Sequence, residues 1–190
     1  MFKKIILFIL IIVAVVGLGY WFYQSSKTEQ SSQEESMIVK AYFGNIEFNP
    51  NMEDCSKVYP VERAVPKSLG VAKAALQELF KGPTEQELNQ GYVSWFSEKT
   101  EDILISVKVE NDTAYLNIKD VRQIIPNAGT SCGSAQFLAE VKTTLKQFST
   151  VSKVIFAIEG IPFNFYEWIQ IGCSEDNDYC NEVPFQTSED

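Results

Sequence analysis

Residues 66–87, PKSLGVAKAALQELFKGPTEQE, decide how the globular part of this chain folds. The apolar residues of this stretch recur at spacings of three and four, which predicts a helix with one buried face. Gly82-Pro83 ends that helix, because glycine accepts the conformation that follows a last turn and proline cannot continue the helix. Residues 84–87 have the pattern of a capping box and predict a short second helix. The buried face of the first helix consists of Leu69, Ala72, Ala75, Leu76, Leu79 and Phe80.

Segments with the composition of β-strands lie on both sides of this helix. Residues 37–43 and 58–65 precede it, and Pro60 restricts the second of these to a sheet edge or a strand start. Residues 103–109 and 114–118 alternate between apolar and other side chains, which predicts a hairpin. A further helix follows, and the apolar run 154–158 predicts a buried strand. The apolar stripe of the further helix is Phe137, Leu138, Val141, Leu145 and Phe148.

The order of these elements is ββαββαβ, which predicts an α+β fold of two layers. We expect a mixed sheet of about five strands with the two main helices packed on one face. The globular domain should extend over residues 37–180, and an acidic tail should follow at 181–190. A segment of this length can bury a sizeable hydrophobic core.

The first 36 residues have the pattern of a membrane anchor and a tether. Residues 5–23 carry no charge, and as a helix they would extend over about 28 Å, enough to cross a hydrocarbon core. Lys3 and Lys4 predict that residues 1–4 lie in the cytoplasm and that the domain lies on the other side. Residues 24–36 contain no apolar side chain and predict a flexible linker.

The alternative for the N-terminal segment is a cleaved signal peptide. Its apolar region would be shorter and would end at small residues, whereas this one ends in the aromatic residues 20–23. Both interpretations export the domain. We therefore expect a protein of the cell membrane, with a single pass and an extracytoplasmic globular domain.

Composition excludes several classes of function. The 190 residues include no histidine, which excludes histidine-dependent nucleophiles and histidine-ligated zinc. A net charge of −9 argues against nucleic-acid binding. No motif predicts a cofactor. A carboxylate-dependent wall hydrolase is the enzymatic alternative, but nothing in the sequence places two acids across a cleft, so we predict no catalytic residue. The acids available are Glu53, Asp54, Glu101, Asp102 and Glu159.

Cys55, Cys132, Cys173 and Cys180 predict disulfides in an exported chain. Four cysteines allow three connectivities. Cys173 and Cys180 flank a short acidic loop and could close it locally, which would leave Cys55 with Cys132. No closely spaced cysteine pair predicts a metal site. Residues 174–190 carry six acidic and no basic residues, which indicates a solvated tail or, alternatively, a site for calcium or a cationic partner.

Three residues are candidates for binding. Arg63 lies on the predicted edge strand next to Glu62, and its planar guanidinium suits a carboxylate or a phosphate. Tyr166 and Trp168 belong to an aromatic group after the last strand, and such side chains stack on sugar rings or anchor interfaces. The alternatives are a structural ion pair for Arg63 and core positions for the two aromatic residues.

Eight short stretches, in order and spacing, resemble the GerM (GerMN) domain family of bacterial sporulation and spore germination proteins. The resemblance covers roughly residues 39–170, and these stretches are residues 58–63, 71–76, 81–84, 91–92, 113–115, 129–132, 145–148 and 155–160. It implies an α/β, non-catalytic module that is often anchored to a membrane or a lipid and has a fold similar to ring-building domains. It also implies a disulfide between Cys55 and Cys132, since the paired cysteines of the family fall at these positions. This chain departs from the family pattern in having one copy and an added segment at 168–180.

We therefore expect a binding or scaffolding module in the bacterial cell envelope. Its partner would be an unidentified envelope protein or a second copy of the chain, through an exposed sheet edge or an aromatic patch. The alternatives are a peptidoglycan-recognition module and a subunit of a carboxylate-dependent wall hydrolase.

Overall fold

The computed structural model describes residues 15, 17–21, 35–67 and 70–186. The predicted cytoplasmic residues 1–4, most of the predicted anchor and linker, and the last four residues of the tail lie outside this part. The chain divides into two compact units, Met1–Glu35 and Ser36–Asp190, and both sheets belong to the second unit. In the described part of the chain, no helix combines the length and the apolar character that a membrane span requires.

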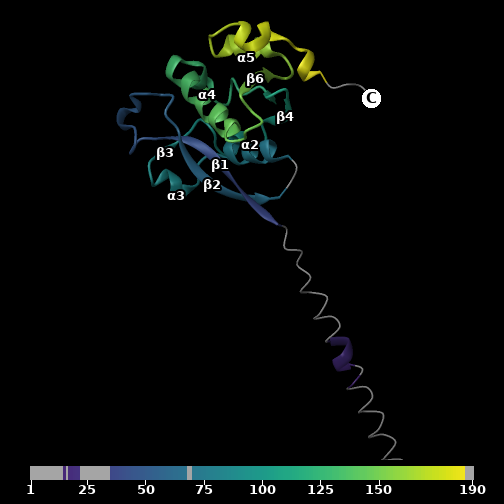
Figure 1. Ribbon diagram of the computed structural model, residues 1–190. Helices are drawn as coiled ribbons and strands as arrows, with labels where there is room; N and C mark the ends of the chain where they lie inside the picture. Colours follow the sequence, from purple (N-terminus) through teal and green to yellow (C-terminus); the bar gives the residue numbers. More distant parts are fainter. Residues whose placement is uncertain (1–14, 16, 22–34, 68–69, 187–190) are drawn as a thin grey trace, which may run out of the picture. The chain divides into compact units, whose positions relative to one another are not determined.

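The first sheet is antiparallel and has the order β2-β1-β3 (Figure 1). Its strands are β1 (Ser36–Asn45), β2 (Tyr59–Pro66) and β3 (Tyr92–Val93). Pro60 and Pro66 lie on the outer strand, opposite Tyr42 and Ser36 of β1. Proline has no N–H to donate, so these positions suit an edge strand, and the predicted edge position of Pro60 is confirmed.

The second sheet is mixed and has the order β4-β5-β6. Strands β4 (Leu104–Glu110) and β5 (Thr113–Ile118) form the predicted hairpin around Asn111 and Asp112. These two turn residues have φ values of 47° and 59°, as the tight turn of a two-residue hairpin requires. Strand β6 (Lys153–Ile158) runs parallel to β5, and helix α4 (Ser131–Lys146) belongs to the crossover between them. The α+β prediction is confirmed, but the single sheet of about five strands is wrong.

Helix α4 explains why β1 does not join the second sheet. The N–H groups of Lys40, Tyr42 and Gly44 point away from β2, and α4 residues and Gln147 accept their hydrogen bonds. The acceptors are Gln147 Oε1 at 2.9 Å, Thr144 Oγ1 at 3.1 Å and Glu140 Oε1 at 3.3 Å. Alternate residues of a strand advance by about 6.6 Å and positions three or four apart on a helix by about 5–6 Å, so the two rows of groups roughly match. Polar side chains therefore close this edge of β1 where we expected another strand.

Helices α2 and α4 occupy the space between the two sheets. Helix α2 (Val71–Phe80) contacts β1 and β4, and α4 contacts β1 and β6. The predicted end of α2 is confirmed: Gly82 has a φ of +77°, and a Cβ atom there would lie 2.2 Å from the carbonyl oxygen of Phe96. The predicted capping box is also present, since Thr84 and Glu87 bond each other's backbone N–H at the start of α3 (Glu85–Leu88). The expectation that both helices pack on one face of one sheet is corrected accordingly.

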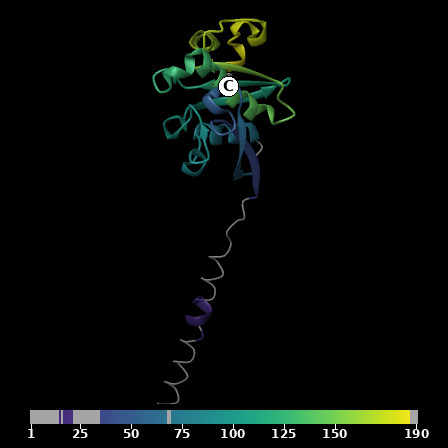
Figure 2. The same cartoon turned by 90° about the vertical axis from the view of Figure 1, so that its left-hand side faces the viewer.

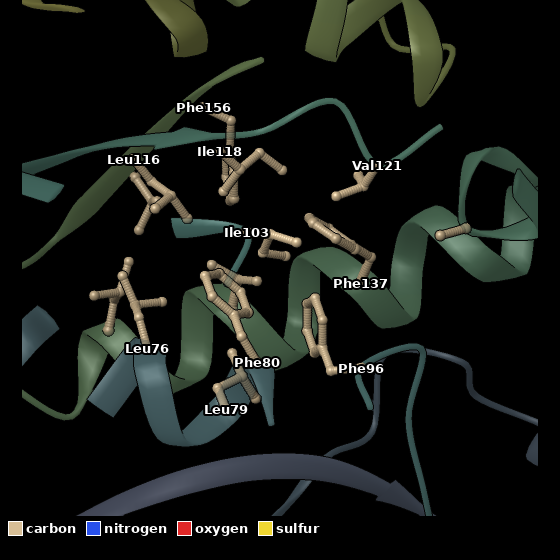
Figure 3. Packing of buried hydrophobic residues seen from close by; sticks show 14 of the residues in the cluster. Leu76, Leu79, Phe80, Phe96, Ile103, Leu116, Ile118, Val121, Phe137 and Phe156 are labelled. Atoms are coloured by element: carbon tan, nitrogen blue, oxygen red, sulfur yellow. The ribbon is translucent and has the colours of Figure 1, made fainter. Parts of the chain in front are cut away.

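Aromatic and branched side chains fill the core between α2, α4 and the second sheet, as Figure 3 shows. Phe137 of α4 is fully buried, and its ring lies between the rings of Phe96 and Phe165, at centroid distances of 5.3 and 5.8 Å. Ring pairs of this kind contribute about 0.5–1.5 kcal/mol beyond their buried area. This core is one contiguous cluster, which holds the two sheets together through the helix layer.

Helix α5 (Pro162–Trp168) and the segment after it lie against β6 (yellow in Figure 2). The hydroxyl of Tyr166 accepts a hydrogen bond of 3.2 Å from the N–H of Phe156, which satisfies one donor on the outer edge of β6. The ring of Phe185 lies edge-on to Tyr115 of β5 at 5.8 Å. Five short 3₁₀ helices complete the described elements: η1 (Pro50–Met52), η2 (Glu98–Thr100), η3 (Pro126–Gly129), η4 (Glu175–Cys180) and η5 (Val183–Phe185).

Candidate functional site

A groove of about 520 Å³ opens beside the turn that joins α2 to α3. Gly82 forms part of the wall of this groove, and no side chain fits at its position. The capping box of α3 fixes the backbone next to it. We call this feature the α2–α3 groove. Its lining residues come from β2, α2, the α2–α3 turn, α3 and the region of η2, and they are Arg63, Glu78, Lys81–Glu85, Leu88, Ser97–Lys99 and Glu101.

Arg63 lies beneath the groove and pairs with two acids, Glu78 and Glu87. Its guanidinium binds the Glu87 carboxylate with two nitrogens, at 2.7 Å between Nη2 and Oε2 and at 2.5 Å between Nη1 and Oε1. Its Nε lies 3.7 Å from Oε2 of Glu78. Only 12% of the Arg63 side chain and 14% of the Glu87 side chain are exposed, so this two-pronged pair is largely protected from water. The guanidinium carbon also lies 6.0 Å from the ring centre of Phe43.

The electrostatics of Glu87 reflect the same contacts. Partial burial alone would raise the pKa of the Glu87 carboxyl, but hydrogen bonds from Arg63 and from the backbone N–H of Thr84 outweigh that effect. The pKa of Glu87 therefore lies below its ordinary value. Lys81, whose side chain is 54% exposed, pairs with Glu78, the acid that also lies near Nε of Arg63. Two of the three basic residues in the lining are thus already neutralised by acids of the domain.

Three acids and one base of the lining remain outside these pairs: Glu85, Glu98, Glu101 and Lys99. Leu88 adds an apolar contact surface, since 53% of this residue is exposed. A second cavity of about 320 Å³ shares Glu78, Lys81 and Glu101 with the groove. The concave surface therefore continues along α2 and combines an excess of carboxylates with apolar positions.

The structure places Tyr166 and Trp168 inside the fold. Tyr166 is buried and accepts a backbone hydrogen bond from β6, and desolvation raises its pKa to about 12. The half-buried ring of Trp168 lies edge-on to Phe137 at 5.6 Å and covers Gly129, where a Cβ atom would lie 2.8 Å from the indole nitrogen. Both residues therefore have packing roles, and a binding role for them stays a prediction. Arg63 is brought to a concave site, but through an ion pair within the domain.

The four cysteines form two disulfides, Cys55–Cys132 and Cys173–Cys180. The first joins the loop after β1 to the start of α4. The second closes the segment that includes η4, where Asp178 pairs with Lys153 of β6 at 3.0 Å. Within the described residues, no group of three His, Cys, Asp or Glu side chains is arranged to hold a metal ion.

The acids that the sequence offered for catalysis lie in different parts of the domain. Glu101 and Asp102 line the groove and its continuation. Glu159 follows β6, and its carboxylate accepts a hydrogen bond from the N–H of Asp120. Asp54 caps a local turn through Ser56, and these hydrogen bonds lower its pKa.

Sequence reasoning missed Glu140, which is fully buried in α4. Its carboxylate accepts hydrogen bonds from Ser94 Oγ at 2.7 Å, Gln136 Nε2 at 2.9 Å and the N–H of Gly44. Desolvation outweighs these donors and raises the pKa of Glu140 to about 8. One pattern in the sequence could have indicated this residue. Gln136, Glu140 and Thr144 are four positions apart, so on a helix they form a polar stripe beside the apolar stripe.

Comparison with known proteins identifies the family of the domain. The family model described as "Germane: Sporulation and spore germination" matches residues 40–163. The chain belongs to this family. The match includes Arg63, the α2–α3 turn and Glu140, and it ends before Tyr166, Trp168 and the Cys173–Cys180 disulfide. A search of curated proteins finds no match.

Three solved structures resemble this Germane domain. The tandem GerMN domains of the sporulation protein GerM from Bacillus subtilis share 21% identity at a TM-score of 0.48, over 66% of this chain and 40% of that one. The first GerMN domain of the same protein shares 22% identity at 0.42, over 65% of this chain and 84% of that one. A putative lipoprotein from Clostridium perfringens shares 16% identity at 0.36, over 65% and 75% of the two chains. The chain thus spans less than half of the tandem structure.

Proposed function

We propose that this Germane-family protein is a non-catalytic binding module, anchored in the cytoplasmic membrane, whose extracytoplasmic domain captures an envelope protein in the α2–α3 groove. The uncharged run at residues 5–23 supports the anchor. Two disulfides support an exported domain, because such bonds persist in oxidising compartments. The family match supports a connection with sporulation or germination proteins.

The observation that carries the proposal is the Arg63–Glu87 pair beneath the groove. The Arg63–Glu87 pair is largely buried and joins two nitrogens to two carboxylate oxygens, so it fixes α3 against β2 in the absence of a ligand. The exposed Leu88 is then presented on a fixed helix, next to a turn whose backbone Gly82 and the capping box define. Such pre-organisation lowers the entropy lost on binding and is typical of a recognition surface.

The lining predicts the chemistry of the ligand. Glu85, Glu98 and Glu101 outnumber Lys99 among the charges not already paired within the groove. A polypeptide segment with a Lys or Arg next to an apolar residue would complement both these carboxylates and Leu88. Peptidoglycan is the competing ligand, and the experiment below separates it from a protein.

A wall hydrolase receives less support from the geometry. Such an enzyme needs two carboxyl groups facing each other at a defined separation. Glu101 belongs to the groove, whereas Glu159 is engaged by the backbone of Asp120. We therefore place no catalytic step in this domain.

The test uses the full-length chain in detergent, as wild type, as Leu88→Arg and as Phe163→Arg. Phe163 is the matched control because 52% of this residue is exposed, against 53% of Leu88, and it lies on α5. The three proteins are sedimented with purified cell-wall sacculi. In parallel, a photo-crosslinker is placed at position 88 or 163 in source-cell envelopes.

A crosslink to one protein from position 88, absent from position 163 and accompanied by no pelleting, is the expected result. Pelleting that Leu88→Arg abolishes and Phe163→Arg preserves would identify peptidoglycan as the ligand and replace the protein partner. If neither readout depends on Leu88, the groove is not a binding site.

A further inference from the structure

The outer edges of the two sheets carry backbone groups that could bind a further strand. Different features of the described chain cover these edges, and one edge is left uncovered. Prolines at positions 60 and 66 interrupt the donors on the outer side of β2, and β3 has only two residues. Helix α4 closes β1 from Lys40 to Gly44, which leaves only the first residues of β1 beyond the closed stretch. On the outer edge of β6, Phe156 donates to Tyr166 and Ile158 donates to the carbonyl of Ile161, and α5 and η4 pack beside the strand. Strand β4 is the remaining edge. Helix α2 contacts β4, but in the described chain no proline interrupts this edge and no group from another segment forms a hydrogen bond with its outward backbone groups.

The register of the hairpin identifies which groups of β4 are open. The two-residue turn makes Glu110 and Thr113 a hydrogen-bonded pair, so Lys108 also directs its N–H and C=O groups towards β5. Val107 and Val109 lie between these pairs and direct their backbone groups outward. Across residues 35–67 and 70–186, no hydrogen bond reaches those outward groups. The bulge between Leu104 and Ser106 limits the regular edge to the second half of the strand.

An apolar slot lies next to this edge. A cavity of about 260 Å³ is lined by Val107 and Val109 of β4, by Val71 and Ala72 of α2, and by Phe148. Val109 is 37% exposed. A strand added to β4 would thus gain backbone hydrogen bonds and an apolar contact together, which is the usual combination in β-strand addition.

We propose that a second copy of this chain pairs with β4, antiparallel across a two-fold axis at Val109, so that two three-stranded sheets become one six-stranded sheet. In this register Lys108 of each copy lies opposite Glu110 of the other, which extends the Lys108–Glu110 ion pair of 2.9 Å within each copy. An axis at Lys108 would instead place like charges opposite each other, and a slip by one residue would turn the apolar side chains to the other face. The strand is therefore self-complementary in charge, and this selects a second copy as the occupant.

The same geometry limits the size of the assembly. One open edge per domain gives a closed, two-fold dimer, because pairing consumes the edge on both copies. The contact is short, so it belongs to the class of weak interfaces. The inference goes beyond the groove and does not depend on a ligand there.

The experiment measures the mass of the full-length chain in detergent by sedimentation equilibrium over a range of concentrations. We expect a monomer–dimer equilibrium whose dissociation constant rises at least about tenfold in Val109→Pro, because proline removes an outward donor on each copy. Val109→Thr is the matched control, since it keeps the donor and the branched shape, and its dissociation constant should match wild type. Dimers of equal strength in Val109→Pro, or monomers at every concentration, would overturn the proposal.

Charge reversal keeps the test decisive if Val109→Pro folds poorly. Lys108→Glu alone places acids opposite acids, and Glu110→Lys alone places bases opposite bases, so each variant should be monomeric. An equimolar mixture of the two should dimerise again, because each Glu then meets a Lys on the other copy. A mixture that stays monomeric contradicts the register. Leu88→Arg should dimerise like wild type, so a failure of the groove and a failure of the edge are told apart.

Discussion

Strands β1 and β4 each have a row of backbone groups on the side away from the strand with which they pair. In β1 these groups form hydrogen bonds within the domain, whereas in β4 they form none within the described chain. On β1, Glu140, Thr144 and Gln147 accept hydrogen bonds from three successive outward N–H groups. On β4, the outward groups of Val107 and Val109 meet no such partner within the described chain. The comparison shows that a polar stripe on a helix can accept the hydrogen bonds that a further strand would otherwise accept. An uncovered edge then stands out as a place for association.

The largest expected effect is on the free energy of unfolding and concerns Glu140, whose carboxyl accepts the hydrogen bond from the N–H of Gly44 in β1. Its pKa rises from 4.5 to about 8 on folding, so the folded chain binds an extra proton between these values and stability should fall as pH rises through that range. Glu140→Gln removes the titration. The loss in wild type should reach on the order of 3–5 kcal/mol, and the variant should show a flat profile in this window.

Urea unfolding at pH 5 and pH 9 measures this difference. The control is Glu98→Gln, which removes an exposed acid of the groove lining and should leave the pH profile of wild type unchanged. The idea fails if wild type and Glu140→Gln have parallel pH profiles.

The two disulfides sharpen the comparison because one holds the closed edge and the other lies on the second sheet. Cys55–Cys132 keeps the start of α4 next to the loop after β1, and its two cysteines are 77 positions apart in the chain. Replacing both cysteines by serine should cost about 4 kcal/mol, against about 2 kcal/mol for the Cys173–Cys180 pair, whose separation is 7. Thermal unfolding of the two double variants tests the order, and a reversed order would contradict it.

A smaller effect is expected at Thr144, which accepts the hydrogen bond from Tyr42. Thr144→Val keeps the shape and leaves a partly buried N–H without an acceptor, so the free energy of unfolding should fall by about 1–3 kcal/mol. The matched change on the open edge, Val109→Thr, should stay within about 0.5 kcal/mol of wild type. Equal effects at the two positions would remove the distinction between closed and open edges.

The smallest effect is expected from Val109→Pro on the stability of the monomer. Because the N–H of Val109 points outward, proline removes no ladder bond within the hairpin. Measured by urea unfolding at a concentration below dimerisation, the change should be about 1 kcal/mol or less. A loss of several kcal/mol would show that this N–H has a partner within the domain.

Much of the local structure could be predicted from residue patterns. The end of α2 at Gly82, the capping box at Thr84 and the edge position of Pro60 were all expected, because each depends on the backbone chemistry of one or two residues. The hairpin of β4 and β5 followed from alternation in the same way. The groove itself was not predicted. Of its lining, the sequence singled out only Arg63 and Glu101 as candidate functional residues, since the lining residues become neighbours through the α2–α3 turn and the region of η2.

The division into two sheets could not be predicted. The apolar stripe of α4 was evident, but its polar stripe has meaning only once β1 lies next to it. The same holds for Tyr166 and Trp168, whose aromatic character suggested a binding patch before their packing against β6 and Phe137 was known.

The sequence by itself determined the longer strands and the two main helices, the lack of histidine chemistry and the membership of a sporulation and germination family, because these depend on composition and on short-range patterns. Only the tertiary structure decided which strand edges are closed and which charges are paired beneath the groove. The physical reason is that a hydrogen bond or an ion pair joins two groups, and here the partners are separated by 24 residues for Arg63 and Glu87 and by 96 for Gly44 and Glu140.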